Sequence, residues 1–189
     1  MTGLSAAGLA AVFALGACGS EEDPAGESTT AATAEQSGDD MTGSAPEDEA
    51  AVPELLDFSA TTLDGASFEG ASLAGGPAVL WFWYEDCPIC QSQGPAVASL
   101  LESEGDRVDI VGVAGPGLLG TSSIEQMQEF VSDTGTEDAT HLQSTDGELW
   151  TRFGVTSQST YVLLDSNGEI VDSGPFADDE LEEKVAELD

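Results

Sequence analysis

The chain has 189 residues, and its 37 acidic residues against three basic ones give a formal net charge of −34 at pH 7. This charge excludes nucleic-acid-binding proteins, which need a basic surface to displace counterions from phosphates, and it disfavours adsorption to an anionic membrane surface. A solvated acidic surface is the simplest interpretation, and an acidic docking face for a basic partner or for Ca²⁺ is the alternative. The sequence contains no compact Asp-x-Asp-x-Asp-Gly loop in support of calcium.

Residues 1–17 carry no charged side chain and contain a short apolar run. The run is shorter than the ~20 residues that a transmembrane helix needs, and it is typical of a signal peptide. The four residues from Leu15 to Cys18 resemble the lipobox of bacterial lipoproteins. The resemblance implies cleavage before Cys18 and a diacylglycerol anchor on its sulfur. No Lys or Arg precedes the apolar run, which departs from that pattern, so an ordinary cleaved signal peptide with an incidental Cys18 is the alternative.

Residues 18–53 have a different composition. They contain ten acidic residues, no basic residue and few large apolar side chains, and they are rich in Gly, Ser, Thr, Ala and Pro. Such a segment cannot bury enough apolar area to offset its conformational entropy, and repulsion between like charges extends it. We therefore expect an acidic disordered tether over 18–53, followed by one folded domain over 54–189, and we expect a monomer.

Apolar patterns predict an alternation of strands and helices from residue 55 onward. Residues 55–75 alternate apolar and polar side chains around Asp64 and Gly65, which predicts a hairpin. Residues 77–84 form an unbroken apolar run, typical of a strand that is covered on both faces. The remaining predicted elements are, in chain order, a helix at 91–104, a buried strand at 107–115, a helix at 121–135, a short strand at 139–143, a helical turn at 146–155, a hairpin at 159–174 and a helix at 178–189. This order predicts an α/β fold in which helices flank a mixed central sheet.

Cys87 and Cys90 are separated by Pro88 and Ile89 and lie where the first buried strand meets its helix. A Cys-x-x-Cys at such a junction is typical of a thioredoxin-like arrangement. Two cysteines in the opening turn of a helix can bring their sulfurs within bonding distance, and the first sulfur faces unpaired backbone N–H groups that favour its thiolate. Pro88 is tolerated there because its position needs no N–H partner. The pattern predicts a reversible disulfide.

From about Phe58 to Asp189 the chain resembles the extracytoplasmic thiol:disulfide oxidoreductases of the TlpA/ResA/DsbE type, and in particular the secreted DsbE/DsbF-like proteins of actinobacteria. Pro95 lies where that family kinks its active-site helix. The other matching stretches are 58–83, 87–90, 145–155 and 161–170.

The resemblance implies a thioredoxin-like fold with an N-terminal β-hairpin. It implies an enzyme, without a cofactor, that exchanges its disulfide with cysteines of exported proteins, with Cys87 as the exposed attacking sulfur and Cys90 as the more buried resolving thiol. It further implies a location outside the cytoplasm, a membrane or extracytoplasmic redox partner, and contact with the membrane only through the lipid anchor.

Other interpretations of the cysteine pair remain open. A purely structural disulfide between such near neighbours gains little from loop entropy. A tetrahedral zinc site needs four ligands, and no metal site is predicted. A thioredoxin-fold copper carrier would use both sulfurs and His141, which lies on the predicted strand at 139–143. A non-catalytic binding module would keep the fold and only remnant chemistry.

The chain departs from the family pattern next to the cysteines. Asp86 stands where the family has an aromatic residue, and it follows Glu85, so two carboxylates disfavour the Cys87 thiolate by like-charge repulsion. Gln93 replaces an acid and therefore offers no carboxylate for proton transfer. These changes predict a pair that is more reducing than a strong oxidase, or a slow one.

The loop that faces the disulfide in the family departs as well. Ser159 occupies the position of a proline whose preceding peptide bond is cis. A cis bond before a residue other than proline costs ~3–4 kcal/mol, so we expect this loop to be trans or reshaped, and substrate docking to differ from the family's. A serine hydroxyl is also expected near the sulfurs, which would make the site less hostile to a metal ion than proline does.

Overall fold

The computed structural model describes residues 52–120 and 122–189. The predicted signal peptide, Cys18 and nearly all of the predicted tether lie outside the described residues. The elements are η1 (Glu54–Leu56), β1 (Ser59–Thr61), β2 (Ser67–Glu69), η2 (Gly70–Leu73), β3 (Ala78–Trp83), α1 (Pro88–Glu104), β4 (Asp109–Ala114), α2 (Ile124–Thr134), β5 (Thr140–Gln143), α3 (Glu148–Arg152), β6 (Thr160–Leu164), β7 (Ile170–Gly174) and α4 (Asp178–Ala186).

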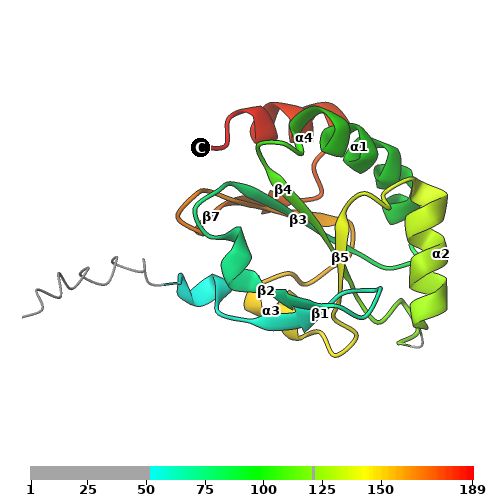
Figure 1. Cartoon of the computed structure of the whole chain (residues 1–189). Coiled ribbons are helices and arrows are strands. Elements are labelled where there is room, and N and C mark those ends of the chain that lie inside the picture. Colours follow the sequence, from blue (N-terminus) through cyan, green and yellow to red (C-terminus); the bar gives the residue numbers. More distant parts are fainter. Residues whose placement is uncertain (1–51, 121) are drawn as a thin grey trace, which may run out of the picture. The chain divides into compact units, whose positions relative to one another are not determined.

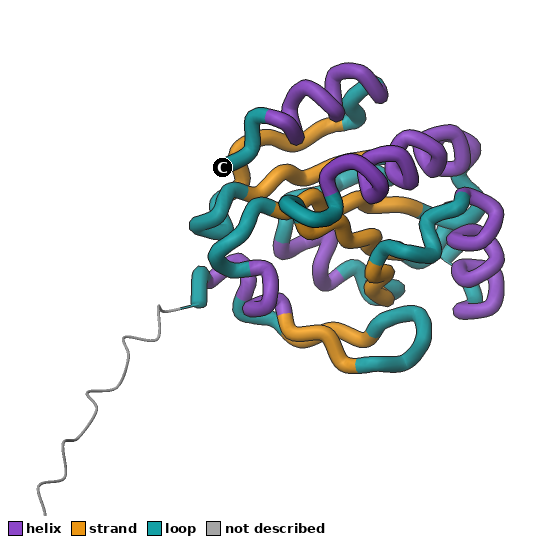
Figure 2. The backbone as a smooth tube through the Cα atoms, turned by 45° about the horizontal axis from the view of Figure 1, so that its top comes forward, coloured by secondary structure: helices purple, strands orange, loops and turns teal. Residues whose placement is uncertain are grey.

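A five-stranded mixed sheet forms the centre, in the order β5-β4-β3-β6-β7 (Figure 1). Strands β3, β4 and β5 run parallel, whereas β6 and β7 are antiparallel to their neighbours. All six residues of β3 are buried, as expected for the apolar run at 77–84, and β3 therefore takes the central position. The predicted N-terminal hairpin forms a separate two-stranded sheet from β1 and β2, which Figure 2 shows beside the main sheet.

Helices cover both faces of the sheet. Successive residues of β3 point to opposite sides, and all of them are apolar, so both sides need a cover. Trp81 and Trp83 pack into one core with residues of α1, α2 and α4. Leu80 and Phe82 pack into the other core with residues of η1, η2 and α3. Figures 1 and 2 show α1 and α4 side by side on the same face. The predicted α/β arrangement, with helices flanking a mixed sheet, is therefore correct.

The predicted elements all occur, but α1, α2 and α3 each start two or three residues from the predicted position. Helix α1 begins at Pro88 rather than at residue 91, so that Cys90 lies within its first turn, and Pro95 is accommodated inside it. Helix α2 begins after Ser123, which exchanges capping hydrogen bonds with Gln126. Its end at Gly135 agrees with the sequence, since this glycine has the left-handed conformation of a C-cap, with φ of 70°.

The three basic residues attach the ends of the folded region to its body. Arg107 donates hydrogen bonds to the carbonyl oxygens of Val185 and Leu188 near the C-terminus, each at 2.8 Å. Arg152 donates to the carbonyl oxygen of Glu54 in η1, at 3.1 Å. The third, on α4, forms an ion pair with β7: Lys184 lies 2.7 Å from Asp172. The cations thus serve the fold, and they are not gathered at the cysteine pair.

Within residues 52–120 and 122–189, none of the helices combines the length and the apolar character that crossing a bilayer requires.

Candidate active site

Cys87 lies four positions after Trp83, the last residue of β3, and is the N-cap residue of α1. Its sulfur accepts a hydrogen bond from the backbone N–H of Cys90, at 3.2 Å. Pro88 occupies the first helical turn, where its missing N–H has no helical partner to lose. Both cysteines are free thiols. The cysteine sulfur therefore takes the place of a conventional capping oxygen, at the helix end that favours negative charge.

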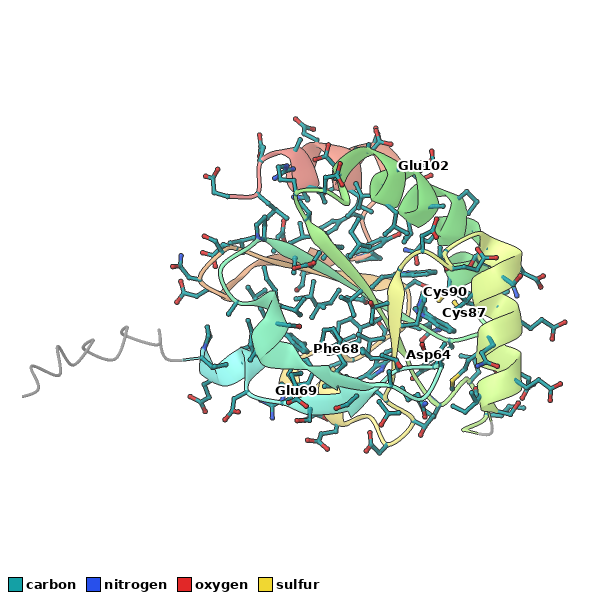
Figure 3. The ribbon with its side chains drawn as sticks, viewed as in Figure 1. Asp64, Phe68, Glu69, Cys87, Cys90 and Glu102 are labelled. Atoms are coloured by element: carbon teal, nitrogen blue, oxygen red, sulfur yellow. The ribbon has the colours of Figure 1, made fainter. Side chains whose placement is uncertain are left out.

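Both sulfurs are covered, which corrects the expectation of an exposed Cys87. Cys87 is 2% exposed and Cys90 is fully buried, so their predicted order is retained but neither is open to solvent. Figure 3 shows the pair at the start of α1, inside the molecule. The cover comes in part from the residue before β6, because the Ser159 hydroxyl oxygen lies 3.2 Å from each sulfur. Ile89, between the cysteines, is 62% exposed and marks the accessible side of this turn.

Ser159 has an unusual backbone. With φ of 63° it is the only residue other than glycine with a positive φ in the described ranges. Such a conformation costs a non-glycine residue about 1–2 kcal/mol. Two hydrogen bonds hold its backbone: the N–H donates to the carbonyl of Phe82 at 2.9 Å, and the carbonyl accepts from the side-chain Nε2 of Gln93 at 3.1 Å. The hydroxyl is thereby held against both sulfurs.

Gln93 connects the helix that carries the cysteines to the Ser159 segment. Its side chain is buried, and its Oε1 accepts a hydrogen bond from the Trp81 indole at 3.0 Å while its Nε2 donates to the Ser159 carbonyl. The sequence indicated only that no carboxylate stands here, and the bridging role was missed. The sequence does place Gln93 on the buried face of the helix, because Cys90, Gln93 and Val97 are spaced by three and four residues.

The carboxylates before Cys87 hold the loop between β4 and α2. Both oxygens of Asp86 accept from the backbone N–H of Leu118, each at 3.0 Å. Glu85 accepts from the Ser122 hydroxyl at 2.5 Å. The sequence predicts the negative charge of both residues beside the cysteine, but it did not indicate their hydrogen bonds to this loop.

The two thiols differ in their surroundings. Burial raises the pKa of the Cys90 thiol to about 12, and its hydrogen bond with Cys87 acts in the same direction, whereas the hydrogen bond with Ser159 opposes it. Cys90 therefore stays protonated across the physiological pH range. The Cys87 sulfur, in contrast, lies at the N-terminus of α1 and accepts the Cys90 N–H at 3.2 Å.

His141 does not join the sulfurs. It is buried in β5, its Nε2 donates to the carbonyl of Thr136 at 2.9 Å, and its ring packs edge-on against Trp83. Burial lowers the pKa of His141, which favours the neutral ring. Among the residues that the structure describes, no group of three or more His, Cys, Asp or Glu side chains could hold a metal ion. The ligand set expected for a copper carrier, two sulfurs with His141, is therefore not assembled.

Comparisons with known proteins agree with this geometry. The redoxin family model matches residues 44–189. The soluble secreted antigen MPT53 of Mycobacterium tuberculosis is 38% identical over 142 residues, which cover 73% of this chain and 78% of MPT53.

Two solved structures of Mycobacterium tuberculosis proteins are similar. DsbF, in mixed oxidised and reduced forms, is 44% identical with a TM-score of 0.66, and the match covers 73% of this chain and 99% of DsbF. A secreted disulfide oxidoreductase homologous to E. coli DsbE is 36% identical with a TM-score of 0.64, covering 71% of this chain and 98% of that protein. The predicted family and fold are thereby confirmed. This chain belongs to the redoxin family and is a thiol:disulfide oxidoreductase with a thioredoxin-like fold.

Proposed function

We propose that this protein exchanges a Cys87–Cys90 disulfide with cysteines of exported proteins outside the cytoplasm. The observation that carries the proposal is the asymmetry of the two thiols at the start of α1. Both side chains are buried, but the sulfur of Cys87 caps the helix and accepts the Cys90 N–H at 3.2 Å, whereas burial raises the pKa of the Cys90 thiol to about 12. Cys87 is accordingly the nucleophile and Cys90 the resolving thiol.

In the reducing direction, the Cys87 thiolate attacks one sulfur of a substrate disulfide. The substrate S–S bond breaks, one substrate sulfur leaves as a thiolate and takes up a proton, and Cys87 is joined to the other in a mixed disulfide. Cys90 then loses its proton and attacks the sulfur of Cys87. This forms the Cys87–Cys90 disulfide and releases the second substrate thiol, so that two electrons have passed to the substrate. The same steps in reverse oxidise a substrate dithiol.

Because Cys87 is 2% exposed, a substrate sulfur reaches it only when the covering side chains move aside. The exposed residues next to Cys87 are Asp86, Pro88 and Ile89, and the Ile89 side chain is 62% exposed. The substrate segment therefore makes its first contacts with this turn rather than with the sulfur.

The proposed location rests on the relatives and on the N-terminal sequence. MPT53 is named a soluble secreted antigen, and the DsbE homologue is described as secreted. The signal-like segment at 1–17 is consistent with export. We further propose a lipid anchor on Cys18, with residues 18–53 as the tether that holds the domain away from the membrane. Exported protein thiols would be the substrates, and a membrane or extracytoplasmic redox partner would regenerate the pair.

Trapping of mixed disulfides tests the exchange. With Cys90→Ser, Cys87 can still form the mixed disulfide but nothing resolves it, so substrates accumulate as thiol-reversible adducts in an extracytoplasmic extract. Cys87→Ser and the double variant are the controls and should trap nothing. Equal recovery from all variants, or none from Cys90→Ser, would favour a non-catalytic binding module instead.

The midpoint potential tests the effect of the acidic flank. The negative charges of Glu85 and Asp86 disfavour a thiolate at Cys87, which favours the disulfide over the dithiol. We expect a couple more reducing than a strong oxidase such as DsbA, at ~−120 mV. Equilibration with glutathione buffers measures it, and a potential as oxidising as that of DsbA would contradict the argument.

A further inference from the structure

We propose that the Ser159 hydroxyl is a third catalytic group, which donates a hydrogen bond to whichever cysteine sulfur carries negative charge and thereby stabilises the dithiol form over the disulfide. This inference rests on the proposed exchange at Cys87 and Cys90. It concerns a residue that departs from the family pattern, and it assigns that residue a chemical role.

The placement of the hydroxyl supports this role. Its oxygen lies 3.2 Å from the sulfur of Cys87 and 3.2 Å from that of Cys90. A serine hydroxyl has one donor and two acceptor sites, so it can donate to one sulfur while it accepts from the other. In the proposed arrangement the protonated Cys90 thiol donates to the hydroxyl oxygen, and the hydroxyl donates to the Cys87 sulfur when that sulfur is a thiolate.

The same atom serves the second half of the exchange. Once Cys87 is bonded to a substrate sulfur, Cys90 has to lose its proton before it attacks. The negative charge then develops on a fully buried sulfur, where an unpaired charge is costly. The Ser159 hydroxyl turns from Cys87 to Cys90 and donates to that sulfur, without any movement of the backbone.

The backbone of Ser159 is held in the conformation that places its hydroxyl against both sulfurs. Its positive φ is unfavourable for a residue with a Cβ, yet the N–H to Phe82 and the carbonyl to Gln93 fix it on both sides. Strained residues of this kind persist where the surrounding structure determines them and cluster at functional sites. Glycine would relieve the strain but would remove the hydroxyl.

Loss of the hydroxyl should shift the redox equilibrium. A hydrogen bond to a charged acceptor is about twice as strong as a neutral one, and a disulfide sulfur carries no charge. The hydroxyl therefore stabilises the thiolate-containing state more than the oxidised state. We expect its removal to favour the disulfide about tenfold in the equilibrium with glutathione, which is ~30 mV toward a more reducing potential. Resolution of the mixed disulfide should slow by about tenfold as well.

The test compares Ser159→Ala and Ser159→Gly with Ser157→Ala in the full-length protein. Both Ser159 variants lack the hydroxyl but differ in backbone freedom, because glycine adopts a φ of 63° without strain. Ser157 is an exposed serine in the same segment and is the matched control. Equilibration with glutathione gives the midpoint potential, and rapid-quench measurement with a disulfide peptide gives the rate of resolution.

The proposal requires the same two changes in both Ser159 variants: the disulfide is favoured about tenfold, and resolution of the mixed disulfide is slower. Ser157→Ala should have the potential and the rate of the unchanged protein. Unchanged Ser159 variants would overturn it. A shift in only one of the two would assign the effect to the backbone, and that too would overturn it. Failure of the underlying exchange looks different, because the unmodified protein itself would then not cycle with glutathione.

Discussion

The Gln93 side chain is the contact through which α1 holds the backbone carbonyl of Ser159, and Gln93→Met tests it. Methionine keeps the length and the helix propensity of glutamine but has neither the amide oxygen nor the amide nitrogen. The substitution leaves the Trp81 indole N–H and the Ser159 carbonyl without the partners that now lie at 3.0 and 3.1 Å.

The expected cost follows from these two contacts. A buried polar group that loses its partner costs about 1–3 kcal/mol, so two such groups predict a loss of about 3 kcal/mol in the free energy of unfolding. That is a large fraction of the ~5–15 kcal/mol of an ordinary domain. It corresponds to a decrease in Tm of about 10 °C at this size.

Urea unfolding of the reduced protein measures this loss, with Gln91→Met as the control. Gln91 is exposed on the same helix, and its substitution should change stability by less than ~0.5 kcal/mol. The midpoint potential is a second readout: with Ser159 no longer held, Gln93→Met should move it in the same direction as Ser159→Ala, and the double variant should add little. A stability equal to that of Gln91→Met, or a fully additive double variant, would refute the coupling between Gln93 and Ser159.

Three further predictions follow from single contacts or sequence features. In Cys87→Ser, alkylation of Cys90 should be slow and should rise steadily with pH up to pH 9, where only ~0.1% is thiolate because burial raises the pKa of this thiol to about 12; a plateau below pH 8, detected by mass spectrometry, would contradict this. Gly94→Ala should destabilise the domain by about 1–3 kcal/mol in urea unfolding, since the added methyl group would overlap the Thr134 side chain of α2. Cys18→Ala should release the protein from the membrane fraction into the medium, and an unchanged membrane fraction would exclude the proposed anchor.

The copper-carrier hypothesis shows where a residue inventory misleads. Thiolate sulfur and imidazole nitrogen both bind copper, so the presence of His141 and two cysteines in one chain suggested one site. In the folded protein His141 belongs to β5, and its Nε2 is already used by the Thr136 carbonyl. The hypothesis required His141 to lie close to the two sulfurs, and the residue types alone do not give that distance.

The sequence by itself determined the elements and the position of the cysteine pair. The apolar run at 77–84 has no polar residue that could face solvent, so β3 had to be central, and Cys87 had to follow it at the helix start. These features depend on neighbours along the chain, and local patterns are sufficient for them.

Tertiary structure decided how the pair is covered and controlled. The family resemblance placed Ser159, 72 residues after Cys87, near the sulfurs, but its contact with both sulfurs and with the Gln93 amide appears only in the folded chain. Cys87 is buried for the same reason, because the residues that cover it approach from a different part of the sheet. The residue types show which hydrogen bonds each side chain can form. The pairing of β3 with β6 brings the groups within hydrogen-bonding distance.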